Sequence, residues 1–273
     1  MKFTRHETPD GPRWALDGNF LPADFNLSAL LSLRRYEIPK ALEAASAGSA
    51  TMADGAALAP LEALMEVWAC GVTYLRSRDA REAESSVGDI YQRVYEAERP
   101  EIFYKAIGWR VRGSGKNLRI RSDSSWNVPE PELTLILNCF GEIIGYTAGN
   151  DLSSRSIEGE NPLYLPQAKC FDGCCALGPE IYLVDEEEHL LNLPVSLQIQ
   201  RGADTVFFGE TSTGRMKRSF SELVNFLFRE MSFPQGVALM TGTGIVPDDS
   251  FTLQHGDRIE IRVGDVRLVN DIT

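Results

Sequence analysis

Three carboxylates and a lysine stand out among apolar residues in the middle of the chain: Glu130, Glu132, Asp151 and Lys169. Glu130 and Glu132 are two residues apart, so their side chains share one face if the segment is extended. Two adjacent carboxylates repel each other unless a cation joins them. The pattern also fits a solvated edge strand, but the apolar run 133–137 predicts a buried strand directly after it. A carboxylate pair at the mouth of a buried sheet needs neutralising.

Glu130, Glu132 and Asp151 offer only oxygen ligands, which hard divalent cations prefer. We therefore expect Mg²⁺, with Mn²⁺ as the alternative and Ca²⁺ as a substitute in crystals. Such a site leaves positions open for water and for a chelating substrate. Zinc suits the trio less well because it contains neither histidine nor cysteine.

Lys169 follows Leu165-Pro166-Gln167-Ala168, so its immediate neighbours are mostly apolar or small. Burial would lower its pKa and make it a proton carrier, or the lysine would stay charged and hold a substrate anion. A side chain that extends to the surface is the alternative. A second candidate is Thr241-Gly242-Thr243-Gly244, where glycines after a strand would expose N–H groups and a hydroxyl toward a small anion. A plain turn fits the same residues.

The composition describes a soluble globular chain. It has 273 residues, of which 43% are hydrophobic and 24% charged, enough for one large domain and a smaller companion. The formal charge of −12 argues against a nucleic-acid partner, whose phosphates need clustered lysine and arginine. No apolar run reaches the roughly 18 residues of a membrane span, and the first residues lack the apolar core of a signal peptide. We expect a cytoplasmic protein without a membrane partner.

The cysteines do not form a zinc-binding pattern, and their odd number favours reduced thiols in a cytosolic chain. We expect small core residues. The five are Cys70, Cys139, Cys170, Cys174 and Cys175.

The chain divides by pattern into a small N-terminal domain, residues 1–65, and a catalytic domain, residues 66–273. Segments 29–36 and 40–45 favour helix on either side of Pro39. A short buried strand over 68–74 is expected to begin the larger domain. A helix is expected over 77–98, ending near Pro100.

Beyond Pro100 the pattern is mostly strand, turn and strand, which predicts an α+β, β-rich fold. One helix is expected after Ser219, which has capping-box spacing with Glu222. The expected strands cover 133–138, 142–148, 180–184, 194–200, 204–208, 237–241 and 258–263.

Several short motifs resemble the fumarylacetoacetate hydrolase family over roughly residues 67–270. They are Arg99-Pro100-Glu101-Ile102-Phe103-Tyr104-Lys105-Ala106, Pro131-Glu132-Leu133, Gly145-Tyr146-Thr147, Asn150-Asp151-Leu152-Ser153-Ser154-Arg155, Gln167-Ala168-Lys169, Leu177-Gly178-Pro179 and Thr241-Gly242-Thr243.

The resemblance implies a small N-terminal α/β domain, a mixed β-sandwich roll and a homodimer or homotetramer. It places Glu130, Glu132 and Asp151 on the metal ligands. Lys169, Arg155 and Thr243 fall on positions that contact the carboxylate and keto oxygens of the substrate or move its protons.

One departure bears on the reaction. Family members that cleave carbon–carbon bonds carry a His and a Glu shortly after a Gly-x-x-Tyr strand, whereas Gly71-Val72-Thr73-Tyr74 is followed by Ser77 and Ala80 at those positions. Ser156 also stands where an aspartate is expected. The remaining motifs resemble the branch of 2-keto-3-deoxy-D-arabinonate and D-xylonate dehydratases. These motifs are Tyr74, Arg76, Ser77, Arg78 and Glu84, with 157–167 and 244–247.

We therefore expect a lyase of sugar-acid catabolism in pentose degradation, which dehydrates a 2-keto-3-deoxy pentonate to 2,5-dioxopentanoate through a metal-stabilised enolate. Lys169 is the expected base at C3 and Glu84 the acid for the C4 hydroxyl. The substrate would be positioned by Tyr74, Arg76, Ser77, Arg155, Gln167 and Thr243.

Two alternatives stay open. An acylpyruvate or diketo-acid hydrolase would use the same metal, with Glu84 activating water. A non-catalytic module that senses keto acids would need the metal pocket but fewer proton-transfer groups than Lys169, Glu84 and Thr243 provide.

Overall fold

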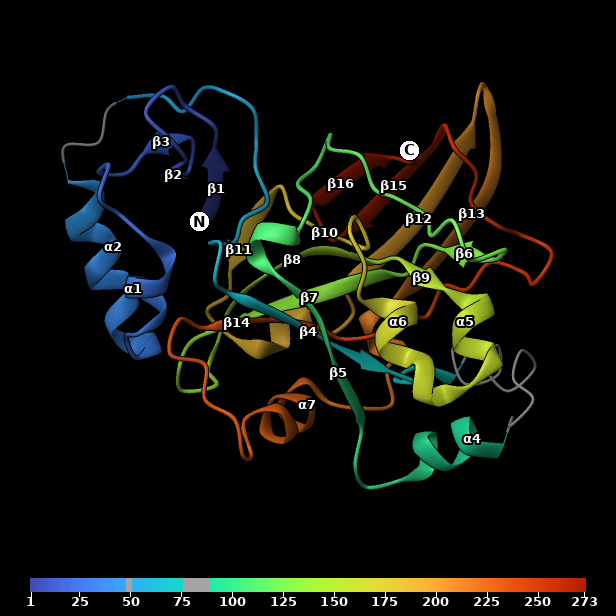
Figure 1. Cartoon of the computed structure of the whole chain (residues 1–273). Coiled ribbons are helices and arrows are strands. Elements are labelled where there is room, and N and C mark those ends of the chain that lie inside the picture. The colour runs from blue at the N-terminus through green and yellow to red at the C-terminus, as the bar shows by residue number, and fades with distance from the viewer. Residues whose placement is uncertain (48–50, 76–88) are drawn as a thin grey trace.

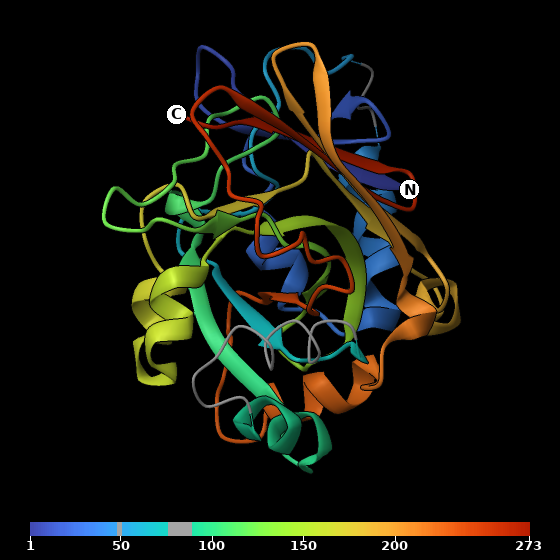
Figure 2. The ribbon, with the colours of Figure 1, turned by 90° about the vertical axis from the view of Figure 1, so that its right-hand side faces the viewer.

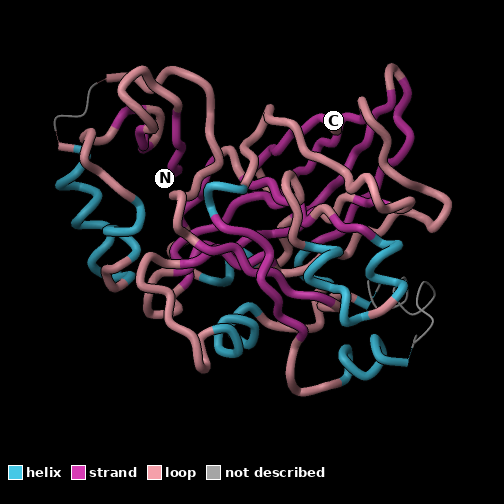
Figure 3. The backbone as a smooth tube through the Cα atoms, viewed as in Figure 1, coloured by secondary structure: helices cyan, strands magenta, loops and turns pink. Residues whose placement is uncertain are grey.

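The computed structural model describes residues 1–47, 51–75 and 89–273, in which strands occupy the centre and helices the periphery (Figure 3). The strands are β1 (Lys2–His6), β2 (Arg13–Leu16), β3 (Asn19–Phe20), β4 (Glu66–Gly71), β5 (Glu101–Ile107), β6 (Asn127–Val128), β7 (Pro131–Leu137), β8 (Ile143–Asp151), β9 (Ser153–Ser154), β10 (Cys175–Leu177), β11 (Glu180–Leu183), β12 (Pro194–Arg201), β13 (Asp204–Ser212), β14 (Val237–Met240), β15 (Asp257–Val263) and β16 (Val266–Asp271). The helices are α1 (Leu27–Leu31), α2 (Ile38–Ser46), α4 (Asp89–Glu96), α5 (Arg155–Glu160), α6 (Leu165–Lys169) and α7 (Phe220–Leu227). Short 3₁₀ turns are η1 (Arg35–Glu37), η2 (Gly108–Arg110), η3 (Pro162–Tyr164), η4 (Glu187–Leu190) and η5 (Thr213–Arg215).

In the described part of the chain the strands form three sheets. Their arrangement can be followed in Figure 1. The largest has ten strands in the order β3-β2-β1-β11-β8-β7-β14-β4-β5, with β10 also paired to β8. It is mixed, because β14 pairs with β4 in parallel and with β7 in antiparallel orientation. A four-stranded antiparallel sheet, β13-β12-β15-β16, lies across one side of it, as Figure 2 shows. A two-stranded ribbon joins β6 and β9.

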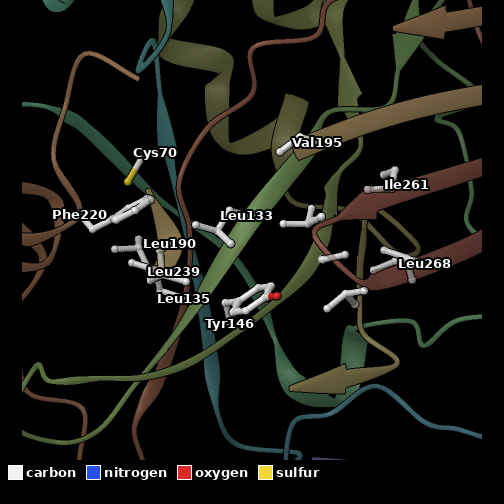
Figure 4. Packing of buried hydrophobic residues seen from close by; sticks show 14 of the residues in the cluster. Cys70, Leu133, Leu135, Tyr146, Leu190, Val195, Phe220, Leu239, Ile261 and Leu268 are labelled. Atoms are coloured by element: carbon white, nitrogen blue, oxygen red, sulfur yellow. The ribbon is translucent and has the colours of Figure 1, made fainter. Parts of the chain in front are cut away.

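The central strands β7 and β14 are buried at every position, and most of their residues are apolar. Successive side chains of a strand point to opposite faces. In β7, Leu133 and Leu135 face the small sheet, whereas Ile136 belongs to a second cluster with α1 and α2. Figure 4 shows the first cluster, in which Leu133 packs in the same core as Ile261 of β15. A core on each side explains why residues 133–137 are apolar at every position except Thr134.

The predicted β-rich class is confirmed. The seven strands expected beyond Pro100 correspond, within a few residues, to β7, β8 and β11 to β15. Helix α7 is also confirmed: the hydroxyl of Ser219 accepts a hydrogen bond from the backbone N–H of Glu222 at 3.2 Å, so the predicted N-cap is present.

Three boundaries differ from the expectation. The strand expected over 68–74 begins at Glu66 and ends at Gly71, before Val72 with its positive φ of 54°. Pro39 does not separate two helices but lies in the first turn of α2, where its missing N–H costs nothing. Of the helix expected over 77–98, α4 covers Asp89–Glu96, and residues 77–88 lie outside the described residues.

The N-terminal strands join the large sheet, because β1 pairs with β11 through Phe3 and Ile181. Helices α1 and α2 pack on the same sheet through Leu31, Ile38 and Leu42. The domain division between residues 65 and 66 remains a prediction.

Candidate active site

The three carboxylates meet where β7 begins and β8 ends. These strands are antiparallel neighbours, and the register pairs Pro131 with Asn150. Glu130 therefore stands directly before β7, Glu132 lies inside it, and Asp151 closes β8. One oxygen from each residue lies within 4.8 Å of the others, and all three side chains are buried. Sheet register, rather than a local motif, thus assembles the trio.

Glu132 is the least compensated member of the trio. Burial and then the charges of Asp151 and Glu130 raise the pKa of its carboxyl well above the ordinary value. The backbone N–H of Gly242, at the end of β14, donates a hydrogen bond of 2.5 Å to Glu132 Oε2 and opposes this shift. An anion in this position requires a further positive charge or a proton.

The donor set fits a hard divalent cation. Glu130, Glu132 and Asp151 provide three converging carboxylates in a buried position, which is the ligand type that Mg²⁺ and Mn²⁺ prefer. A cation held by all three would also meet the charge requirement of Glu132.

Lys169 is buried and points into the trio. Its Nζ donates hydrogen bonds to Glu130 Oε2 at 2.7 Å, Asp151 Oδ2 at 2.9 Å and Ser153 Oγ at 2.6 Å. Of the two orientations left open by the sequence, the structure has the buried one, with an exposed fraction of 2%. The lysine lies at the end of the short helix α6, which packs against β5 and β9 (Figure 1).

Arg155 holds the other side of Glu130. Its Nη2 donates to Glu130 Oε1 at 2.8 Å, and the guanidinium is buried at the start of α5. The next residue, Ser156, makes a hydroxyl contact of 2.8 Å with Ser124 rather than with the trio. The departure at Ser156 therefore leaves the ligand geometry intact.

Lys105 is a site residue for which no role was predicted from the sequence. This lysine of β5 is fully buried, and its Nζ forms an ion pair of 2.5 Å with Asp151 Oδ1. Burial opposes the charge, yet the Asp151 carboxylate raises the pKa of Lys105 above its ordinary value. The available signal was a lysine within the otherwise uncharged, strand-like run 102–107.

A small cavity opens beside the trio. Thr243 and Lys169 line it together with Glu130 and Glu132. Glu158 of α5 also lines it and is buried, although the sequence singled it out only as part of a longer motif. Burial, and then the charge of Glu132, raise the pKa of Tyr74. Tyr74 lines a separate, larger cavity together with Gly244.

One further described candidate, Gln167, is not brought together with the trio. Gln167 lies on α6 but is exposed, and its backbone carbonyl accepts a hydrogen bond of 3.1 Å from Arg121. Arg76, Ser77 and Glu84 lie outside the described residues.

All five cysteines are free thiols, and Cys70, Cys174 and Cys175 are buried. These free thiols agree with the expectation of reduced cysteines. None of the helices in the described part of the chain has the length and apolar character that a membrane crossing needs.

Comparison with known proteins identifies close relatives. The model of the fumarylacetoacetate (FAA) hydrolase C-terminal family matches residues 67–273. A "Probable 2-keto-3-deoxyxylonate dehydratase" of Haloferax volcanii is 46% identical over 221 residues, covering 81% of this chain and 76% of the relative. The "2-dehydro-3-deoxy-D-arabinonate dehydratase" of Saccharolobus solfataricus is 42% identical over 206 residues, covering 74% and 69%.

A solved structure extends the similarity to the whole fold. It is described as "2-keto-3-deoxy-D-arabinonate dehydratase complexed with magnesium and 2,5-dioxopentanoate". The TM-score is 0.80 at 31% identity, and the match covers 100% of this chain and 99% of the other.

Proposed function

The chain belongs to the fumarylacetoacetate hydrolase family, and we propose that it is a magnesium-dependent dehydratase of a 2-keto-3-deoxy sugar acid. With a pentonate as substrate, the product is 2,5-dioxopentanoate. One observation carries the proposal: the buried trio and Lys169 lie in a fold shared with a dehydratase that was solved with magnesium and this product.

Glu130, Glu132 and Asp151 are the proposed ligands, with Mg²⁺ as the ion and Mn²⁺ as the alternative. A bound divalent cation supplies Lewis acidity, which stabilises negative charge developing on the substrate's carboxylate and keto oxygens.

Lys169 is proposed to move the proton at C3. Its Nζ is held by Glu130, Asp151 and Ser153, and the residue lines the cavity, so the amine is oriented beside the space proposed for the substrate. A base must lie within hydrogen-bond reach of the proton that it removes. Thr243, on the same cavity wall, is suited to bind a substrate oxygen through its hydroxyl.

The proposed reaction eliminates the C4 hydroxyl of the substrate as water. The C3–H bond breaks toward Lys169, the C4–O bond breaks, and the hydroxyl leaves as water with a proton from the proposed acid, Glu84. Tautomerisation then gives the aldehyde. Tyr74, Arg76, Ser77, Arg155 and Gln167 are the further proposed substrate-binding residues.

We also infer a cytoplasmic homodimer or homotetramer. The five free cysteines suit a reducing compartment. Val206 and Phe208 are exposed by 38% and 58% on the edge strand β13, which suits contact with a second copy. Light scattering of the purified protein measures the assembly.

A direct comparison of substrates tests the reaction. The protein is incubated with Mg²⁺ and either 2-keto-3-deoxy-D-arabinonate or an acylpyruvate. We expect 2,5-dioxopentanoate from the first and no pyruvate from the second. Release of pyruvate at a comparable rate would identify a carbon–carbon hydrolase instead, whereas thermal stabilisation by both compounds without turnover would identify a binding module.

A further inference from the structure

Lys105 contacts the trio but does not line the cavity beside it. It extends from β5, has an exposed fraction of 0%, and contacts three acceptors. Its Nζ lies 2.5 Å from Asp151 Oδ1 and donates to the backbone carbonyls of Leu152 at 2.9 Å and Lys169 at 2.7 Å. The ammonium group therefore makes two hydrogen bonds and one ion pair, all within the protein interior.

The two oxygens of Asp151 therefore have different surroundings. Oδ1 faces Lys105, which is fully buried and does not line the cavity beside the trio. Oδ2 accepts from Lys169 at 2.9 Å, and Lys169 lines the cavity at the end of a long flexible side chain. A cation approaching Oδ1 would be repelled by the ammonium of Lys105, whereas Lys169 can yield or share Oδ2, because a carboxylate oxygen has more than one lone pair.

The other two ligands are held in the same manner. Arg155 binds Oε1 of Glu130 at 2.8 Å, and the N–H of Gly242 binds Oε2 of Glu132 at 2.5 Å. Each carboxylate of the trio thus has one oxygen held by a fixed donor of the protein.

This pattern matters for the choice of cation. Ca²⁺ takes about six to eight oxygen ligands and often binds both oxygens of one carboxylate. Mg²⁺ takes fewer protein ligands, each through a single oxygen, and keeps several waters. A site in which carboxylates offer one oxygen each disfavours Ca²⁺ relative to Mg²⁺.

We propose that Lys105 is a positioning residue that limits Asp151 to one-oxygen ligation and thereby disfavours Ca²⁺ relative to Mg²⁺. The inference rests on the proposed function for the identity of the ion, and it assigns Lys105 a role in selecting that ion. Lys105 is not among the residues that line the cavity beside the trio.

The test measures a ratio of affinities. Calorimetric titration gives the dissociation constants of Mg²⁺ and Ca²⁺ for metal-free wild type and for Lys105→Met, which keeps the length of the side chain but removes its charge and donors. Loss of a positive charge strengthens the binding of both divalent ions alike, so this effect cancels in the ratio of the two affinities. We expect affinity for Ca²⁺ relative to Mg²⁺ to rise about tenfold or more, as for other groups that orient metal ligands.

A matched control separates this effect from general destabilisation. Arg201 pairs with buried Asp257 in the small sheet at 2.7 and 2.8 Å. Arg201→Met should lower stability and leave the affinity ratio unchanged. An unchanged ratio in Lys105→Met, with both affinities shifted together, would overturn the proposal.

A second measurement does not depend on the folding of a variant. Crystals of the wild type soaked in Ca²⁺ should show Asp151 bound through one oxygen, with Oδ1 still on Lys105. A Ca²⁺ ion bound by both Asp151 oxygens would contradict the inference. Dehydration by the wild type with Mg²⁺ is measured in parallel. If the wild type is active but the Ca²⁺-to-Mg²⁺ affinity ratio is unchanged in Lys105→Met, only the inference about Lys105 is refuted. If the wild type is inactive but the ratio rises in Lys105→Met, only the proposed function is refuted.

Discussion

Lys169 Nζ lies 2.7 Å from Glu130 Oε2, although the two residues are 39 positions apart in the chain. The contact forms because α6 ends beside the start of β7, and it places an amine in a buried cluster of carboxylates. Lys169 also touches Asp151 at 2.9 Å, so one side chain contacts two of the three proposed metal ligands. The proposed proton carrier is therefore in direct contact with two proposed metal ligands.

Replacing Lys169 should abolish proton transfer. In Lys169→Met the amine proposed to take the C3 proton is gone, and general acid–base catalysis typically contributes about 10²- to 10⁴-fold. We expect kcat to fall by that order, together with exchange of the C3 proton for deuterium in heavy water. Lys40→Met, at an exposed position of α2, serves as the control and should keep both rates. Undiminished C3 exchange in Lys169→Met would assign the base to another residue.

Gly242 should tolerate no side chain. Its φ is +94°, and an added Cβ would lie 2.0 Å from Thr73 Oγ1. Gly242→Ala should lower the free energy of unfolding by about 1–3 kcal/mol, the usual scale of such strain, and weaken Mg²⁺ binding by shifting the N–H that holds Glu132. Urea unfolding and calorimetry measure the two effects.

Gly115→Ala is the matched control for that variant. Gly115 has a similar φ of +79°, but an added Cβ meets nothing within 4 Å. It should cost only the backbone strain and leave metal affinity unchanged. Equal losses in the two variants would mean that the close approach to Thr73 has no energetic effect.

The stability contributed by Glu142 should depend on pH. Burial raises its pKa, but the backbone N–H of Arg35, the amide of Asn138 and the charge of Arg34 outweigh burial and hold the pKa below its ordinary value. A lowered folded-state pKa stabilises the protein above the unfolded value, about 4.3, and this contribution is lost as pH falls through the folded value.

Glu142→Gln should therefore be less stable than the wild type by about 1 kcal/mol at neutral pH, the scale of one net hydrogen bond. The difference in unfolding free energy should shrink below the ordinary pKa of glutamate. Denaturant unfolding at neutral and acidic pH measures it, and a difference that stays constant across this window would exclude the carboxylate as its source.

The N-cap of α7 should contribute to stability in a local manner. Ser219→Ala removes the hydroxyl that accepts from Glu222 N–H, at a typical cost of about 1 kcal/mol in unfolding free energy. Ser221→Ala, two residues later in the same helix, is the control and should cost less. Equal losses in thermal unfolding would show that the cap is not the source.

The sequence predicted those parts of the site that depend on residue type and local pattern. Glu130, Glu132 and Asp151 were recognisable as carboxylates beside apolar runs, and β7 and β8 followed from those runs. The role of Lys105 could not be predicted in this way, because a lysine in a strand is usually exposed and its partner, Asp151, is brought to it only by the strand order of the large sheet.

The N-terminal strands were missed for a related reason. β2 and β3 have four and two residues, too few for a periodic pattern, and β1 is completed by pairing with β11 near the middle of the chain. Short strands that depend on distant partners carry little local signal.

The most direct test is metal-dependent turnover of 2-keto-3-deoxy-D-arabinonate by the wild type and by Glu132→Gln. After exhaustive EDTA treatment the wild type should form no 2,5-dioxopentanoate, and added Mg²⁺ should restore the product. Glu132→Gln should fold but remain inactive with Mg²⁺, because one ligand is lost. Full activity in the metal-free wild type or in Glu132→Gln would contradict the account.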